Sequence, residues 1–135
     1  MNFKFHHIGL IVKDIILSKE YYSNNLKWEI ISDIIYDPIQ KVKVIFLRDP
    51  IKMDVLYELI EPLEEDSPSI DWLKKGNSLH HFCYEISDIN EAIKVVEESG
   101  GFKITNPEPA VAFNNRKIAF MFTPQKLIIE LLEEK

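Results

Sequence analysis

The sequence predicts an α+β fold in which two tandem βαβββ modules form a curved mixed sheet around a cleft. Three observations support this prediction. Several segments alternate apolar and polar residues, as half-buried strands do. Two segments with apolar residues at helical spacing each follow such a strand. The order of segments then recurs in the second half of the chain. We expect one domain over residues 1–135, with module one at about 1–62, a linker helix at about 63–78 and module two at about 79–135.

Module one begins with a predicted strand at residues 3–12, which are rich in Phe, Ile, Leu and Val. Asp14 follows, and its side chain can accept hydrogen bonds from the free amides of a first helical turn. Ile15, Tyr22 and Leu26 then share one face of the expected helix. Turn signals separate three more apolar segments, which predict strands at 28–35, 41–48 and 53–60.

The linker helix is expected to have Ser67 as its cap, Pro68 at its first position and Gly76 just past its end. Module two begins with a predicted strand at 79–87, and Asp88 with Glu91 forms the pattern of a capping box. The helix that follows has an apolar stripe and ends at Gly100-Gly101. The stripe consists of Ile89, Ala92, Ile93 and Val96, and the remaining strands are expected at 102–106, 116–122 and 127–133.

The two modules also resemble each other in their letters. FHHIGLIVKDI at 5–15 aligns with LHHFCYEISDI at 79–89, and YEL at 57–59 aligns with IEL at 129–131. His7 and His81 are therefore 74 positions apart, and Glu58 and Glu130 are 72 apart. Duplicated modules that pair their sheets enclose one cleft, so a shared site is expected there.

The matched histidines and glutamates predict a metal-binding cleft. Side chains alternate between the faces of a strand, so one imidazole of each His-His pair can face the cleft. If the second one does, His7 and His81 are equivalent, as are Glu58 and Glu130. A single His or Glu in a strand is more often an ordinary half-buried or solvated residue. Recurrence inside two otherwise apolar strands favours ligands instead, and the donor set suits one divalent ion such as Ni, Co, Mn, Zn or Fe.

Composition restricts the partners. The net charge of -6 and the pI near 5.2 leave no general basic surface for nucleic acid or anionic lipid. The single Cys83 excludes an intrachain disulfide, the first residues lack the pattern of a secretory signal, and the apolar runs are far shorter than the roughly 20 residues of a membrane span. We expect a cytoplasmic protein with a small-molecule substrate.

The segments HHIGLIVKDI, ELIEPLEEDSPSIDWL, LHHFCYEISDI and IIELLE resemble the vicinal oxygen chelate (glyoxalase/bleomycin resistance/dioxygenase) superfamily. Within it, methylmalonyl-CoA epimerases are the most similar group. The resemblance implies that the second His of each pair is the ligand. The implied metal ligands are His7, Glu58, His81 and Glu130.

The resemblance also implies an isomerase or epimerase that acts through a metal-stabilised enolate, with Glu130 or Glu58 as the catalytic base. A homodimer and an acyl-CoA or glutathione thioester substrate follow from the same resemblance. A lactoylglutathione lyase, which is glyoxalase I-like, has the same ligand set and is the alternative enzyme. A metal-free protein that sequesters a small-molecule drug is the alternative from another class.

The chain departs from the epimerase pattern in its substrate loops. Val42-Lys43-Val44 stands where some epimerases have an acidic residue, and AVAFNNRK at 110–117 replaces a glycine-rich loop. Arg116 and Lys117 in this loop could bind an anionic substrate, or they could be solvated charges at the end of a strand. Cys83 shares a strand face with His81 and is expected to be a small buried filler.

Overall fold

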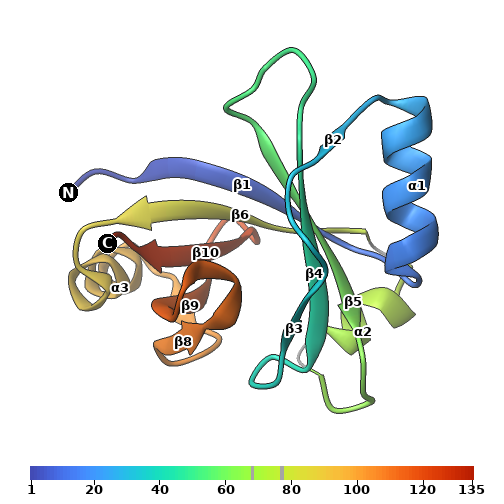
Figure 1. The fold of residues 1–135 in the computed structure, drawn as a ribbon. Coiled ribbons are helices and arrows are strands. Elements are labelled where there is room, and N and C mark those ends of the chain that lie inside the picture. Colours follow the sequence, from blue (N-terminus) through green and yellow to red (C-terminus); the bar gives the residue numbers. More distant parts are fainter. Residues whose placement is uncertain (68, 77) are drawn as a thin grey trace. The chain divides into compact units, whose positions relative to one another are not determined.

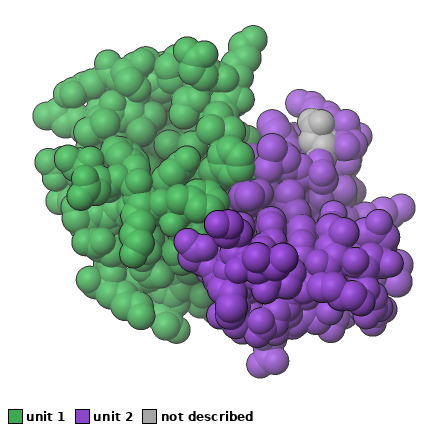
Figure 2. Space-filling view, turned by 90° about the horizontal axis from the view of Figure 1, so that it is seen from above, with its two compact units in different colours: residues 1–6, 81–135 green, residues 7–80 purple. Residues whose placement is uncertain are grey.

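The computed structural model describes residues 1–67, 69–76 and 78–135, and contacts divide the chain into two compact units (Figures 1 and 2). Unit 1 comprises Met1–His6 and His81–Lys135, and unit 2 comprises His7–His80. The first six residues join unit 1 because Phe5 packs edge-on against Phe82 and Tyr84, with ring centroids 6.4 and 5.9 Å apart. Strand β1 (Lys4–Ile11) therefore contributes residues to both units.

Unit 2 follows the order strand, helix, strands. Its sheet has the order β2-β4-β5-β1, and β3 also pairs with β4. The β1–β5 pair is parallel, whereas β4 is antiparallel to β5, β2 and β3, so the sheet is mixed. The elements after β1 are α1 (Ile15–Asn25), β2 (Glu29–Ile30), β3 (Ile35–Asp37), β4 (Val42–Arg48), β5 (Leu56–Pro62) and α2 (Ile70–Lys74). The predicted strand at 28–35 is thus two short strands, both paired with β4.

Helix α1 begins where the sequence predicts. Asp14 accepts hydrogen bonds from the amides of Ile16 and Leu17 at 3.0 and 3.1 Å. Ile15 is fully buried in a cluster with residues of β4 and β5, and Tyr22 packs against this cluster. The prediction for Leu26 is wrong: it is the C-cap and is 48% exposed, because the helix ends at Asn25 and the chain turns away.

The linker helix α2 is shorter than predicted and has a different cap. Ser69, rather than Ser67, is its N-cap residue. Ser67 is buried and its hydroxyl donates to the Gln40 carbonyl at 3.1 Å, so it joins α2 to the β3–β4 turn instead of capping the helix. Pro68 lies outside the described residues. Gly76 follows the helix with φ of +76°, as a helix-ending glycine does.

Unit 1 repeats the same order of elements. Its sheet has the order β6-β10-β9-β7, and β8 also pairs with β9. β10 is parallel to β6 and antiparallel to β9. The elements are β6 (Leu79–Ile86), α3 (Ile89–Glu98), β7 (Phe102–Lys103), β8 (Glu108–Ala110), the 3-10 helix η1 (Val111–Phe113), β9 (Arg116–Phe122) and β10 (Ile128–Glu133). The predicted strand at 102–106 is only two residues long, and the sequence did not predict β8.

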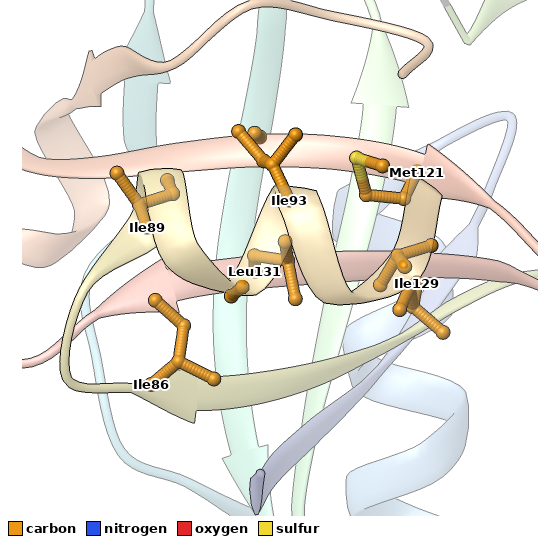
Figure 3. Close-up of a cluster of buried hydrophobic side chains, with 9 residues drawn as sticks. Ile86, Ile89, Ile93, Met121, Ile129 and Leu131 are labelled. Carbon is orange, nitrogen blue, oxygen red and sulfur yellow. The ribbon is translucent and has the colours of Figure 1, made fainter. Parts of the chain in front are cut away.

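Helix α3 packs on one face of this sheet, as Figure 3 shows. Asp88 caps it by accepting from the Glu91 amide at 3.0 Å. All four residues of its predicted stripe are buried, and they pack against sheet residues that include Met121, Ile129 and Leu131. The α+β fold class is confirmed, and both modules have the predicted order of strand, helix and further strands, with four strands after each helix where three were predicted. Among the described residues, the helices lack the length and apolar character that a membrane span requires.

Candidate metal centre

Unit 2 contains a buried His–Glu pair on neighbouring strands. His7 Nε2 of β1 lies 3.2 Å from Glu58 Oε1 of β5, and the two residues are 0% and 5% exposed. In the parallel register, Gly9 of β1 lies opposite Glu58. Because glycine has no side chain, it leaves space beside Glu58 that the His7 ring can approach along the strand. Phe46 of β4 pairs with Glu58, and its ring meets the His7 ring edge-on at 5.7 Å.

Unit 1 contains a second pair with the same geometry. His81 Nε2 of β6 lies 3.2 Å from Glu130 Oε1 of β10, and these residues are 1% and 2% exposed. Phe120 of β9 pairs with Glu130, and its ring meets the His81 ring edge-on at 5.2 Å. Cys83 stands opposite Glu130, where unit 2 has Gly9, and it is buried as expected.

The other histidine of each pair has a different environment. His6 is partly exposed and packs edge-on against Phe113, and His80 is partly exposed and packs against Trp72. His7 and His81 are each completely or almost completely buried beside a glutamate. Within each unit, the histidine that is almost completely buried beside a glutamate is therefore the one that the family resemblance selects.

The chemistry of each pair fits a divalent cation. An imidazole nitrogen and a carboxylate oxygen face each other with little access to water, and both are of the kinds that could hold a metal ion. Burying a carboxylate is costly unless positive charge or hydrogen bonds compensate for it. A divalent ion supplies that charge and accepts both donor types. Metal binding by His7, Glu58, His81 and Glu130 stays a prediction.

Arg116 forms hydrogen bonds and a ring contact within unit 1. Its Nη1 donates to Glu85 Oε2 at 2.9 Å and to the Glu133 carbonyl at 3.4 Å, and its guanidinium lies 5.8 Å from the centre of the Phe113 ring. Burial raises the pKa of Glu85, but the Arg116 hydrogen bond and nearby positive charges outweigh it, so this pKa lies below its ordinary value. Lys117 is exposed. Substrate binding by Arg116 and Lys117 also stays a prediction.

Two glutamates on the opposite faces of the sheets escaped the sequence reasoning. Glu61 Oε1 accepts from the Ile15 amide at 2.9 Å, and Glu133 Oε2 accepts from the Ile89 amide at 3.0 Å. The sequence does indicate them, because ELIE at 58–61 repeats as ELLE at 130–133.

Comparison with known families identifies the fold. The profile of the Glyoxalase/Bleomycin resistance protein/Dioxygenase superfamily matches residues 6–120. The chain belongs to this superfamily. It is 29% identical over 120 residues to the ethylmalonyl-CoA/methylmalonyl-CoA epimerase of Cereibacter sphaeroides, and the match covers 87% of each chain.

Two solved structures have the same fold as this chain. A hypothetical protein from Bacillus halodurans superposes with a TM-score of 0.84 at 29% identity, covering 100% of this chain and 96% of the other. Methylmalonyl-CoA epimerase from Mycobacterium tuberculosis superposes with a TM-score of 0.81 at 23% identity, covering 98% and 88%. The similarity of fold to this epimerase therefore extends over nearly the whole chain.

Proposed function

We propose that this protein is a metal-dependent epimerase of the methylmalonyl-CoA epimerase type, which moves a proton at an acidic C–H group of an acyl-CoA thioester. One observation carries the proposal: the chain contains two buried His–Glu pairs, each with the same 3.2 Å separation, at positions that the internal repeat makes equivalent. The 29% identity to an epimerase over 87% of both chains supports the choice of reaction.

We propose that the two pairs together hold one divalent ion, with His7, Glu58, His81 and Glu130 as ligands. The two carboxylates would balance the charge of a dication held by these residues. When bound, the ion would supply stabilisation of negative charge on a substrate oxygen next to the carbon that loses its proton. Ni, Co, Mn, Zn and Fe all suit these ligands.

The residues of the two pairs have separate roles in the proposed proton transfer. Glu130 or Glu58 takes the proton from the substrate carbon, because a carboxylate is the basic group that each pair contains. Return of a proton on the other side of that carbon inverts its configuration without a redox change. His7 and His81 complete the proposed ligand set beside the carboxylates, with Nε2 at 3.2 Å from Oε1 in each pair, and Phe46 and Phe120 pack against the imidazoles.

A lactoylglutathione lyase, which converts the hemithioacetal of methylglyoxal and glutathione into a glutathione thioester, is the second candidate. The observation that favours it is the ligand set itself, because a glutamate occupies position 58, where some epimerases have glutamine. Both candidates begin with removal of a proton from a carbon next to an oxygen that carries developing charge. They differ in the substrate and in the return of the proton, because an epimerase returns it to the same carbon and the lyase must place it on the neighbouring carbon to form the thioester.

Proton exchange tests the proposal directly. Purified protein loaded with Mn, Co, Ni or Zn is incubated in deuterium oxide with methylmalonyl-CoA, or with the hemithioacetal of methylglyoxal and glutathione. We expect deuterium at the acidic carbon of methylmalonyl-CoA, and strong loss of exchange in Glu130→Gln or Glu58→Gln. Glu20→Gln, on α1 and outside both pairs, is the control. Turnover of the hemithioacetal alone would favour the lyase, and no exchange or turnover with either substrate would favour a sequestering protein.

The expected homodimer is part of the same proposal. Light scattering coupled to size-exclusion chromatography tests it, and a mass near 15.8 kDa would contradict it because that is the mass of one chain.

A further inference from the structure

We infer that Glu61 and Glu133 are positioning residues, which keep each His–Glu pair in register from the opposite face of its sheet. The inference rests on the proposed metal centre and adds two residues to it. Neither glutamate belongs to a His–Glu pair. Each instead connects the strand that carries the pair's glutamate to the helix that follows the pair's histidine strand.

In unit 2, this connection runs through the first amide of α1. Glu61 stands three residues after Glu58 on β5, so the two side chains point to opposite faces of the sheet. Glu61 accepts from the Ile15 amide at 2.9 Å, and its other oxygen lies 3.8 Å from Lys43 Nζ. Ile15 begins α1, which is joined to β1 by only three residues. The strand of Glu58 is thereby tied to the end of the strand of His7.

Unit 1 has the same connection. Glu133 stands three residues after Glu130 on β10 and accepts from the amide of Ile89, the first residue of α3, at 3.0 Å. Its own carbonyl accepts from Arg116 at 3.4 Å. Ile15 and Ile89 are 74 residues apart and Glu61 and Glu133 are 72 apart, the same separations as the histidines and glutamates of the two pairs. The helix connection and the His–Glu pair therefore repeat as one arrangement.

The physical effect is control of strand register. A strand that slips by one residue turns every side chain to the other face, which would remove Glu58 or Glu130 from its imidazole. The first amides of a helix have no partner within the helix, and a carboxylate there is also favoured by the helix dipole. Glu61 and Glu133 thus make a favourable bond only when the strand and the helix are aligned.

A simple helix cap is the competing explanation, and the chain contains a matched control for it. Asp14 accepts from the amides of Ile16 and Leu17, at the same end of α1, but it belongs to the turn before the helix and not to β5. Asp88 has the same role at α3. Removing an aspartate weakens the helix end and leaves the strand connection intact, whereas removing a glutamate breaks the connection.

The test measures Co²⁺ binding by calorimetry, the absorption spectrum of bound Co²⁺, and stability in urea. We expect Glu61→Leu and Glu133→Leu to weaken Co²⁺ binding by about tenfold, as loss of supporting contacts does at metal sites, and to change the spectrum. Glu61→Gln and Glu133→Gln keep an oxygen acceptor and should restore most of the affinity. Asp14→Ala and Asp88→Ala should lower stability without changing the affinity or the spectrum.

The outcomes separate the inference from the proposal beneath it. Wild-type affinity and spectrum in folded Glu61→Leu and Glu133→Leu would overturn the positioning role, as would equal weakening by Asp14→Ala. Should the leucine variants not fold, Glu61→Asp shortens the side chain by one methylene and should also weaken Co²⁺ binding, and unchanged binding there would overturn the role. A wild-type protein that binds no Co²⁺ would overturn the metal centre, and the inference with it.

Discussion

Leu131 and Glu130 are neighbours on β10, and they should respond to mutation in opposite ways. Leu131 is 0% exposed and packs in the cluster beneath α3, which Figure 3 shows from the helix side. Glu130 points to the other face, toward His81. One face of the strand therefore stabilises the fold, and the other carries the proposed chemistry.

The magnitude for Leu131→Ala follows from its complete burial. Truncating a fully buried leucine costs about 2.7–5.0 kcal/mol, because apolar contact is lost and a cavity remains. For a chain of 135 residues, we expect a loss of about 3 kcal/mol and a melting temperature lower by roughly 10 °C. Glu130→Gln keeps an oxygen that His81 can approach, so its free energy of unfolding should change by no more than about 1 kcal/mol.

The assay compares urea unfolding with metal titration of the folded protein. Leu131→Ala should lose stability but retain wild-type metal affinity, and Glu130→Gln should retain stability but lose metal affinity. A cost below about 1 kcal/mol for Leu131→Ala would show that the residue is not packed as described. Loss of metal binding in folded Leu131→Ala would refute the separation of the two faces.

Two further predictions concern unit 1. The Arg116 ion pair holds the pKa of Glu85 below its ordinary 4.5, so the pair adds stability above pH 4.5 that is lost as the pH falls through the lower folded value. In urea unfolding between pH 3 and pH 7, the free energy of unfolding of Glu85→Gln should therefore decrease less toward acid than that of the wild type, and an equal decrease would contradict this. A Cβ on Gly101 would lie 2.6 Å from Val96 Cγ1 and 2.8 Å from the Phe122 carbonyl oxygen, so Gly101→Ala should cost about 1–3 kcal/mol in thermal unfolding, and an unchanged melting temperature would contradict the crowding.

The internal repeat explains why so much of the fold could be predicted. It places the same strand-to-helix junction twice, with Asp14 and Asp88 as caps, and both caps are present in the structure. It also pairs each His with its Glu, because residues at equivalent positions of duplicated modules occupy equivalent places. Local patterns that occur twice are stronger evidence than either copy alone.

The errors arise where no repeat or periodicity guides the reasoning. Ser67 and Ser69 are both good helix caps, and the choice between them depends on a tertiary contact from Ser67 to Gln40 that local sequence does not reveal. Leu26 fits the apolar stripe of α1, but the helix ends one residue before it. The strand β8 contains Pro109 and is three residues long, so it is too short to show the alternation by which longer strands are recognised.

The supporting glutamates were missed for a different reason. An acidic residue at the end of an apolar strand is normally solvated, so neither Glu61 nor Glu133 by itself predicts a structural role. Their partners are backbone amides, which leave no trace in the sequence of Ile15 or Ile89. Only the recurrence of E-L-aliphatic-E could have indicated them.

The stoichiometry of bound metal tests the central claim most directly. Native mass spectrometry of protein dialysed against Mn²⁺ or Co²⁺ counts the ions on each chain. The account predicts one ion per chain, and loss of that ion in His7→Ala as well as in His81→Ala, since each module supplies one His–Glu pair to a single site. Two ions per chain, or an ion retained at full affinity in either variant, would contradict it.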